Sequence, residues 1–166
     1  MTRTDVPPAP DERSTLLQML TYVRETAIAK VEGLSDEHAQ HAPLATSPLT
    51  TPGAIVNHLR WVEADWLQTR FAGGPDLGPW TEDDPDAELR EGLTTPLADV
   101  VAGYREQIVA SDAVIAAADL DDLAAVPTAR LHQNLRWTLL HLVEETARHN
   151  GHLDLLREMA DGVVGD

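Results

Sequence analysis

The segment 141–152 carries four polar side chains at helical spacing that could do chemistry together. Its sequence, HLVEETARHNGH, contains His141, Glu145, His149 and His152. A helix turns by about 100° per residue, so these four side chains lie within about 80° of one another on a single stripe. Imidazole and carboxylate groups three or four residues apart on a helix can bind one metal ion together. The spacing leaves three pairs open: His141 with Glu145, Glu145 with His149, and His149 with His152.

A second candidate segment contains His58, which shares a helical stripe with Trp61 and Val62. A polar imidazole on the apolar side of a helix needs a partner. A single buried histidine most often forms only hydrogen bonds. In an ordinary helix, a stripe such as that in 141–152 would be a solvated face or a face with salt bridges. Together, however, facing helices could supply two histidines and a glutamate to one ion. Imidazole with carboxylate, without thiolate, suits zinc, nickel, iron or manganese.

Four segments with apolar residues at helical spacing must position these side chains. The helices are predicted at about residues 11–33, 52–73, 96–118 and 134–160. The tetrad Leu-Thr-Thr-Pro occurs before the second and the third, where threonine followed by proline is a helix start signal. No segment alternates as a half-buried strand does. We therefore expect an all-α protein, with residues 1–166 forming a single domain built as a four-helix bundle.

A long connection, residues 74–95, separates the second predicted helix from the third. It is rich in glycine, proline and aspartate, and it has Trp80 near its middle and one expected helical turn at 86–90. Connections of this length usually have a function or lack fixed structure. Covering the pocket next to the candidate metal site is one role that we consider for it.

The composition excludes several classes of function. The 166 residues include 12 Lys and Arg, 28 Asp and Glu and no cysteine, for a formal charge of −16. The absence of cysteine excludes thiol catalysis by the protein itself, cysteine zinc fingers and iron–sulfur clusters. An acidic chain without a basic cluster repels nucleic acid and anionic membranes, so we expect neither as a partner. Without a signal peptide or a run of roughly 18 apolar residues, a soluble, cytoplasmic protein is expected.

Two segments resemble the signature motifs of the DinB-like superfamily of bacterial metalloenzymes. Residues 56–63, VNHLRWVE, are similar to its first motif, and residues 140–152 are similar to its C-terminal motif, Glu or His followed by x-x-x-His-x-Gly. The resemblance extends over most of the chain, and it points to an actinobacterial subgroup related to mycothiol-dependent enzymes. It implies a four-helix bundle with an up-down-down-up arrangement and a divalent metal held by three protein ligands.

Carried onto this chain, the resemblance implies His58, Glu145 and His149 as the metal ligands, with zinc expected ahead of nickel, iron or manganese. Many members have histidine where this chain has Glu145, and glutamate is the choice of the thiol-dependent maleylpyruvate isomerases. His141 and His152 fall outside this triad, and we expect them to support a ligand or to line the pocket.

Four further residues are candidates for the pocket: Asn57, Trp61, Asp65 and Arg148. Arg148 could anchor an anionic substrate, and Asp65 could act as a base. Residues of these types more often pack in the core, carry a surface charge or lie on a solvated face. The sequence therefore predicts no catalytic residue beyond the ligands.

The resemblance implies thiol chemistry. An ion with three protein ligands and an open position can bind a thiol or water and lower its pKa. Because the chain has no cysteine, the sulfur would come from a low-molecular-weight thiol cosubstrate of the mycothiol type. We therefore predict a metal-dependent thiol S-transferase or thiol-dependent isomerase acting on a small electrophile. The alternatives are a metal-dependent hydrolase and a non-catalytic metal- or small-molecule-binding stress protein, and a homodimer is one expected assembly.

Overall fold

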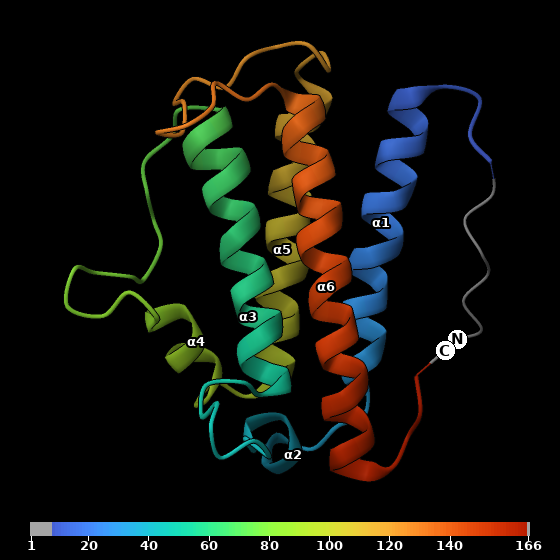
Figure 1. Ribbon diagram of the computed structural model, residues 1–166, viewed down its shortest axis with the longest axis vertical. Helices are drawn as coiled ribbons and strands as arrows, with labels where there is room; N and C mark the ends of the chain where they lie inside the picture. Colours follow the sequence, from blue (N-terminus) through green and yellow to red (C-terminus); the bar gives the residue numbers. More distant parts are fainter. Residues whose placement is uncertain (1–7, 166) are drawn as a thin grey trace.

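Four long helices lie side by side in the computed structural model, which describes residues 8–165 (Figure 1). They are α1 (Glu12–Val31), α3 (Pro52–Glu63) continued by the π-helix η1 (Ala64–Phe71), α5 (Leu97–Ala116) and α6 (Leu135–Asp161). Helices α1 and α6 run in one direction, and α3 and α5 run in the other (Figure 1). Within residues 8–165 there is no strand, only an isolated bridge between Leu123 and Asn134. The prediction of an all-α protein is confirmed for this part of the chain.

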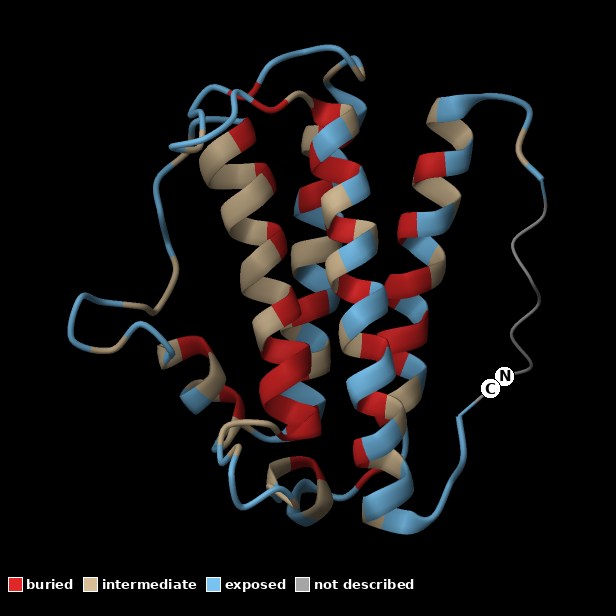
Figure 2. Ribbon diagram, in the orientation of Figure 1, coloured by how far each residue is buried: buried red, intermediate tan, exposed pale blue. Residues whose placement is uncertain are grey.

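Two short helices complete the described structure. Helix α2 (Asp36–Gln40) lies at the end of the molecule where α1 ends and α3 begins, and α4 (Ala87–Gly92) lies beside α3 (Figure 1). The first two turns of α3 are buried on all sides, since six consecutive residues from Pro52 to Asn57 are buried (Figure 2). None of the helices in the described residues is long and apolar enough to cross a membrane.

Side-chain caps explain where most of the long helices begin. Asp11, Thr51 and Asn134 each accept a hydrogen bond from a backbone N–H in the first turn of α1, α3 and α6. The start signal before α5 acts differently. Pro96 occupies the capping position without a side-chain bond, and the backbone N–H of Leu97 donates to Asp36 of α2 at 2.8 Å. The start of α5 is therefore capped by a residue distant in sequence.

The predicted helix at 52–73 is not uniformly α-helical. After Glu63 it continues as η1, and the N–H of Ala72 donates to the carbonyl oxygen of Leu67, five residues earlier. Gly73, with a φ of 72°, follows the end of this helix. A π-helix changes the rotation between successive residues. A stripe extrapolated from His58 along an α-helix therefore does not hold beyond Glu63.

The core contains a buried ion pair that joins three helices. The guanidinium of Arg24 on α1 donates to both carboxylate oxygens of Glu63 on α3, at 2.8 and 2.7 Å. The Tyr104 hydroxyl on α5 donates to Glu63 at 3.1 Å, and Arg24 also donates to Asp112 at 2.8 Å. Arg24, Glu63 and Tyr104 are 3%, 1% and 0% exposed, so each needs these partners. The apolar residues at helical spacing on α1 are buried as well: Leu16, Leu20, Val23, Ala27 and Val31.

Candidate metal site

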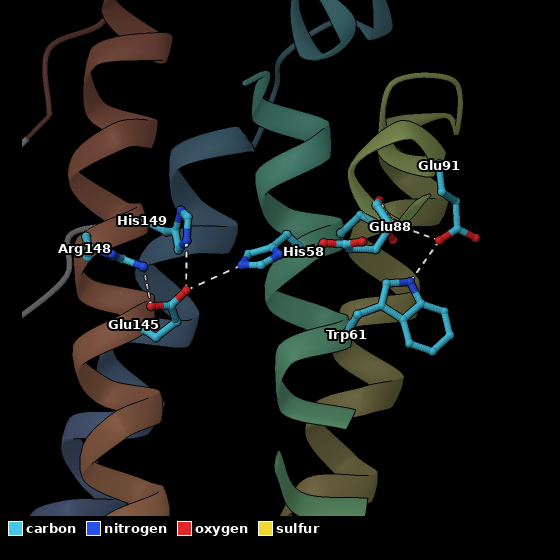
Figure 3. Close-up of polar contacts among 8 residues, drawn as sticks. His58, Trp61, Glu88, Glu91, Glu145, Arg148 and His149 are labelled. Atoms are coloured by element: carbon cyan, nitrogen blue, oxygen red, sulfur yellow. Dashed lines mark hydrogen bonds and ion pairs between the residues drawn. The ribbon is translucent and has the colours of Figure 1, made fainter. Parts of the chain in front are cut away.

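The structure brings His58, on α3, next to Glu145 and His149, on α6 (Figure 3). The Nε2 atoms of His58 and His149 lie 3.5 and 3.1 Å from the same atom, Glu145 Oε1. One ligand atom from each residue lies within 4.8 Å of the others. Among the described residues, this is the one group of three histidine or acidic side chains placed to hold a metal ion. Of the three pairs that the sequence left open, it contains Glu145 with His149.

The His58 ring is oriented from behind by a carboxylate. Glu88 Oε1 lies 3.3 Å from His58 Nδ1, the ring nitrogen that faces away from Glu145 (Figure 3). Metal-binding histidines commonly donate their second ring N–H to such a partner. Glu88 belongs to α4, so the 74–95 connection contributes to the site.

The other two donor residues are held in the same way. Arg148 Nη2 donates to Glu145 Oε2 at 2.6 Å, which leaves Oε1 for the histidines. His152 Nδ1 lies 3.3 Å from His149 Nδ1. The sequence expected His152 to support a ligand or line the pocket, and the structure places it beside His149 in the pocket wall. Each donor residue therefore has one polar atom held by a neighbour and one facing the common centre.

The local electrostatics favour the protonation states that bind cations. Burial and the nearby His58 ring lower the pKa of His149 to about 4, against the opposing effect of Glu145. Burial alone would raise the pKa of Glu145, but the His149 ring, Arg148 and hydrogen bonds from both histidines outweigh it and lower that pKa. At neutral pH His149 is therefore a neutral imidazole and Glu145 a carboxylate, as metal ligands must be.

Two of the three separations between the donor atoms fit a small divalent cation. Zinc binds histidine nitrogen and carboxylate oxygen at about 2.0–2.2 Å, so tetrahedral ligand atoms lie roughly 3.3 Å apart. The two separations to Glu145 Oε1, 3.1 and 3.5 Å, lie on either side of this value. A structural zinc site has four protein ligands, whereas a catalytic site has three and an open position. His58, Glu145 and His149 together offer three protein ligands.

A pocket of about 530 Å³ opens onto the three donor residues. One side of it comes from the connection between α2 and α3, which the sequence did not predict to take part. Trp80 is not among the lining residues, and the 74–95 connection supplies only Leu89 to the pocket wall. The connection therefore does not cover the pocket, which was one role that we considered for it. Besides the donors, the lining residues are Leu44, Ser47, Leu49, Thr50, Ile55, Leu89, Arg148 and His152.

Two predicted pocket residues face α4 instead. Asn57 Nδ2 donates to the carbonyl oxygen of Glu88 at 2.6 Å and to Glu91 Oε2 at 2.8 Å. Trp61 Nε1 donates to the same Glu91 oxygen at 2.9 Å (Figure 3). Neither residue lines the pocket that opens onto the donor residues, because both lie on the face of α3 that holds α4.

Asp65 and His141 are also away from the donor group. Asp65 lies in η1, accepts a hydrogen bond from Arg70 at 2.6 Å and does not line the pocket, so it cannot act there as a base. The His141 ring packs against Trp66 and Trp137, with ring centroids 4.6 and 5.2 Å away, and the two tryptophan rings also contact each other. Neither residue contributes to the group of three, and His141 is not in the pocket wall as the sequence suggested.

Sequence reasoning missed Glu88 and Glu91. Glu88 lies in the turn expected at 86–90, and Glu91, three residues later, comes directly after it, so the two would share one face if the turn continued. That spacing was the one available signal, and nothing in it indicates which helix the two glutamates contact.

The comparison with curated proteins finds no match for this chain. A family model described as mycothiol-S-transferase matches residues 15–162, from the first turn of α1 to the glycine that ends α6. The match therefore includes all three donor residues and α4. The family is part of the DinB-like superfamily, to which the motifs around His58 and His149 pointed. The chain belongs to the mycothiol-S-transferase family of the DinB-like superfamily.

Proposed function

We propose that this protein is a metal-dependent enzyme that transfers a low-molecular-weight thiol of the mycothiol type to a small electrophile. Its family supports thiol transfer. One observation supports the metal dependence: three donor atoms converge at the wall of one pocket, and a neighbouring polar side chain contacts each of the three residues. In the reaction the thiol loses its proton, and its sulfur forms a bond to the electrophilic carbon. The electron pair displaced at that carbon goes to the acceptor or leaving group of the substrate.

His58 Nε2, Glu145 Oε1 and His149 Nε2 are the atoms that would hold the cation, with zinc the first choice and nickel, iron or manganese the alternatives. A divalent cation with an open position lowers the pKa of a thiol that binds to it and so supplies thiolate at neutral pH. The chain's own residues prepare the surroundings. Glu145 is kept ionised by Arg148, and the leucine and isoleucine side chains of the pocket exclude water from the reacting groups.

Arg148 has a second use in this proposal. It holds Glu145 Oε2 with one N–H group, and its guanidinium, which has five N–H donors, also lines the pocket. The remaining donors can bind an anionic or carbonyl group of a substrate. A thiol-dependent isomerase would begin by forming the same bond between sulfur and carbon. We therefore keep isomerisation as a variant of the proposed reaction.

Two alternatives have less support. The hydrolase would use an acidic neighbour such as Asp65 as a base, and Asp65 is paired with Arg70 and does not line the pocket. A non-catalytic protein with a structural zinc would have a fourth protein ligand. The described residues offer three, since neither His141 nor His152 joins the group.

The opposite directions of the helix pair α1 and α6 and the pair α3 and α5 support the up-down-down-up bundle of the superfamily, which we also propose. A single domain, a cytoplasmic location, a small-molecule substrate and a homodimer, without nucleic-acid or membrane partners, stay predictions from the sequence.

Metal analysis combined with a thiol-transfer assay tests the proposal. We expect the purified protein to hold about one equivalent of a divalent metal by emission spectroscopy. It should conjugate mycothiol to a haloaromatic electrophile, and a chelator should abolish this activity. His149→Ala should lose both metal and activity, while His41→Ala, which changes an exposed histidine outside the pocket, should keep both. Full metal content in His149→Ala, or conjugation that survives removal of the metal, contradicts the proposal.

A further inference from the structure

We propose that Glu88 is a positioning residue that prepares His58 to bind the metal, and that α4 holds Glu88 in place for this purpose. The inference rests on the proposed function, because the cation that His58 would bind belongs to that proposal. No family motif around His58 or His149 includes Glu88, and it contacts the site through His58 alone among the three donor residues.

The chemistry of the contact determines which nitrogen of His58 is protonated. An ionised carboxylate only accepts hydrogen bonds, so Glu88 Oε1, at 3.3 Å, favours the proton on His58 Nδ1. Glu145 Oε1 lies farther away, 3.5 Å from Nε2 on the other side of the ring. When a cation takes the lone pair of Nε2, the remaining ring proton must be on Nδ1, where Glu88 can accept it.

Glu88 is unusual for a residue with only a structural role. Its side chain is 9% exposed, and its second oxygen, Oε2, is buried without a hydrogen-bond partner. Burying an incompletely paired carboxylate is costly, and an apolar residue of similar size would usually be at least as stable there. A role in setting the proton position of His58 explains why a carboxylate occupies this place.

Helix α4 is attached to α3 at two points that fix the position of Glu88. Asn57 Nδ2 donates to the backbone carbonyl of Glu88 itself, at 2.6 Å. Asn57 and Trp61 both donate to Glu91 Oε2, one turn further along α4, at 2.8 and 2.9 Å (Figure 3). The α4 backbone is thus bound directly at Glu88 and braced at Glu91.

The two helix backbones also touch where α4 ends. A Cβ added to Gly92 would lie 2.6 Å from the Cα of Ala54, and one added to Gly53 would lie 2.8 Å from the carbonyl oxygen of Gly92. Gly53, Asn57 and Trp61 are four residues apart, so they form one face of α3, and that face binds α4. His58 lies next to this face and connects α4 with the donors on α6.

Zinc affinity and the His58 tautomer test this inference together. Glu88→Gln keeps the size of the side chain and removes its charge, and Glu82→Gln makes the same change at an exposed position of the same connection. By competition with a chromophoric chelator, we expect Glu88→Gln to bind zinc about 10–100-fold more weakly than wild type, with Glu82→Gln unchanged. Nitrogen-15 NMR of the metal-free proteins should show the Nδ1–H tautomer of His58 in wild type and a smaller share of it in Glu88→Gln, because a neutral amide is a weaker acceptor and can also donate.

A second variant separates positioning from folding. Glu88→Leu fills the same buried space without a charge, so we expect it to fold with a melting temperature at or above that of wild type and still to bind zinc weakly. Wild-type zinc affinity in both Glu88 variants, or an unchanged His58 tautomer, overturns the inference and leaves the proposed function intact. A wild-type chain that binds no divalent metal overturns the proposed function, and this inference with it.

Discussion

Tyr104 shows how strongly single residues of the core depend on their partners. Its hydroxyl donates to Glu63, which also binds Arg24 through both carboxylate oxygens. Burial, with the negative charge of Glu63 next in effect, raises the pKa of Tyr104 well above its ordinary value of 10.0. The phenol therefore keeps its proton in the folded protein under conditions where an exposed tyrosine loses it.

This shift predicts a loss of stability at alkaline pH. Above pH 10 the unfolded chain releases the Tyr104 proton and the folded chain keeps it, so the folded state binds more protons and its free energy of unfolding falls as the pH rises. The contribution is complete below that pH. We expect urea unfolding of the wild type to show this fall and Tyr104→Phe to show a smaller one. Equal pH dependence of the two proteins would contradict the shift.

The contact between α3 and α4 is an element-scale feature, because it depends on two backbones rather than on side chains. Gly53 and Gly92 meet where neither helix has room for a Cβ atom. The depth at which α4 sits against α3 is therefore set by these glycines, and Glu88, one turn before Gly92, moves with it.

Gly92→Ala should separate the two helices. Overpacking of this kind costs about 1–3 kcal/mol in the free energy of unfolding, and displacement of Glu88 should also weaken zinc binding. Gly151→Ala is the matched control, since Gly151 is exposed within α6 and an added Cβ meets nothing within 4 Å. That variant should gain about 0.5–1 kcal/mol. Chemical unfolding measures both changes, and a neutral Gly92→Ala would show that the contact can relax without cost.

Elements with a periodic pattern could be predicted from the sequence, and contacts between elements could not. The stripe of Glu145 and His149 follows from the rotation of an α-helix, and the cap at Thr51 follows from its place before a proline. Glu88 could not be found, because its contact with His58 spans 30 residues through a helix too short to have a pattern. The pairing of Asp65 with Arg70 in η1 was likewise not indicated by the sequence pattern.

Arg24 illustrates the same limit in the core. It follows Val23 in α1, and the spacing of the apolar residues does not indicate that a charged side chain is buried there. Its burial is possible because Glu63 on α3, 39 residues away in the sequence, supplies the opposite charge. Charge pairing across elements leaves no periodic signal along the chain.

The molecule as a whole carries far more acid than base, with 28 Asp and Glu against 12 Lys and Arg. Mutual repulsion of surplus charge destabilises a compact state, and dissolved salt screens it. Exposed ion pairs such as Arg105 with Glu25 are weakened by the same screening, but each is worth only about 0–1 kcal/mol. At a formal charge of −16 the repulsion is the larger effect.

We therefore expect the midpoint of thermal unfolding to rise as sodium chloride is added from low to physiological concentration. Neutralising two exposed acids of the 74–95 connection, in a Glu82→Gln/Asp83→Asn double variant, should raise the midpoint at low salt and make it less sensitive to salt. A midpoint that falls with salt would mean that the ion pairs outweigh the repulsion.

His58 and Glu145 are 87 residues apart in the sequence, and they face each other across the middle of the molecule. An ion bound by both would act as a cross-link between two distant parts of the chain. Secreted proteins use disulfides for this, which restrict the unfolded chain more as the closed loop becomes longer. In a chain without cysteine, the ion proposed for catalysis would also fasten α3 to α6, so that the supply of metal to the cell would control the lifetime of the protein as well as its activity.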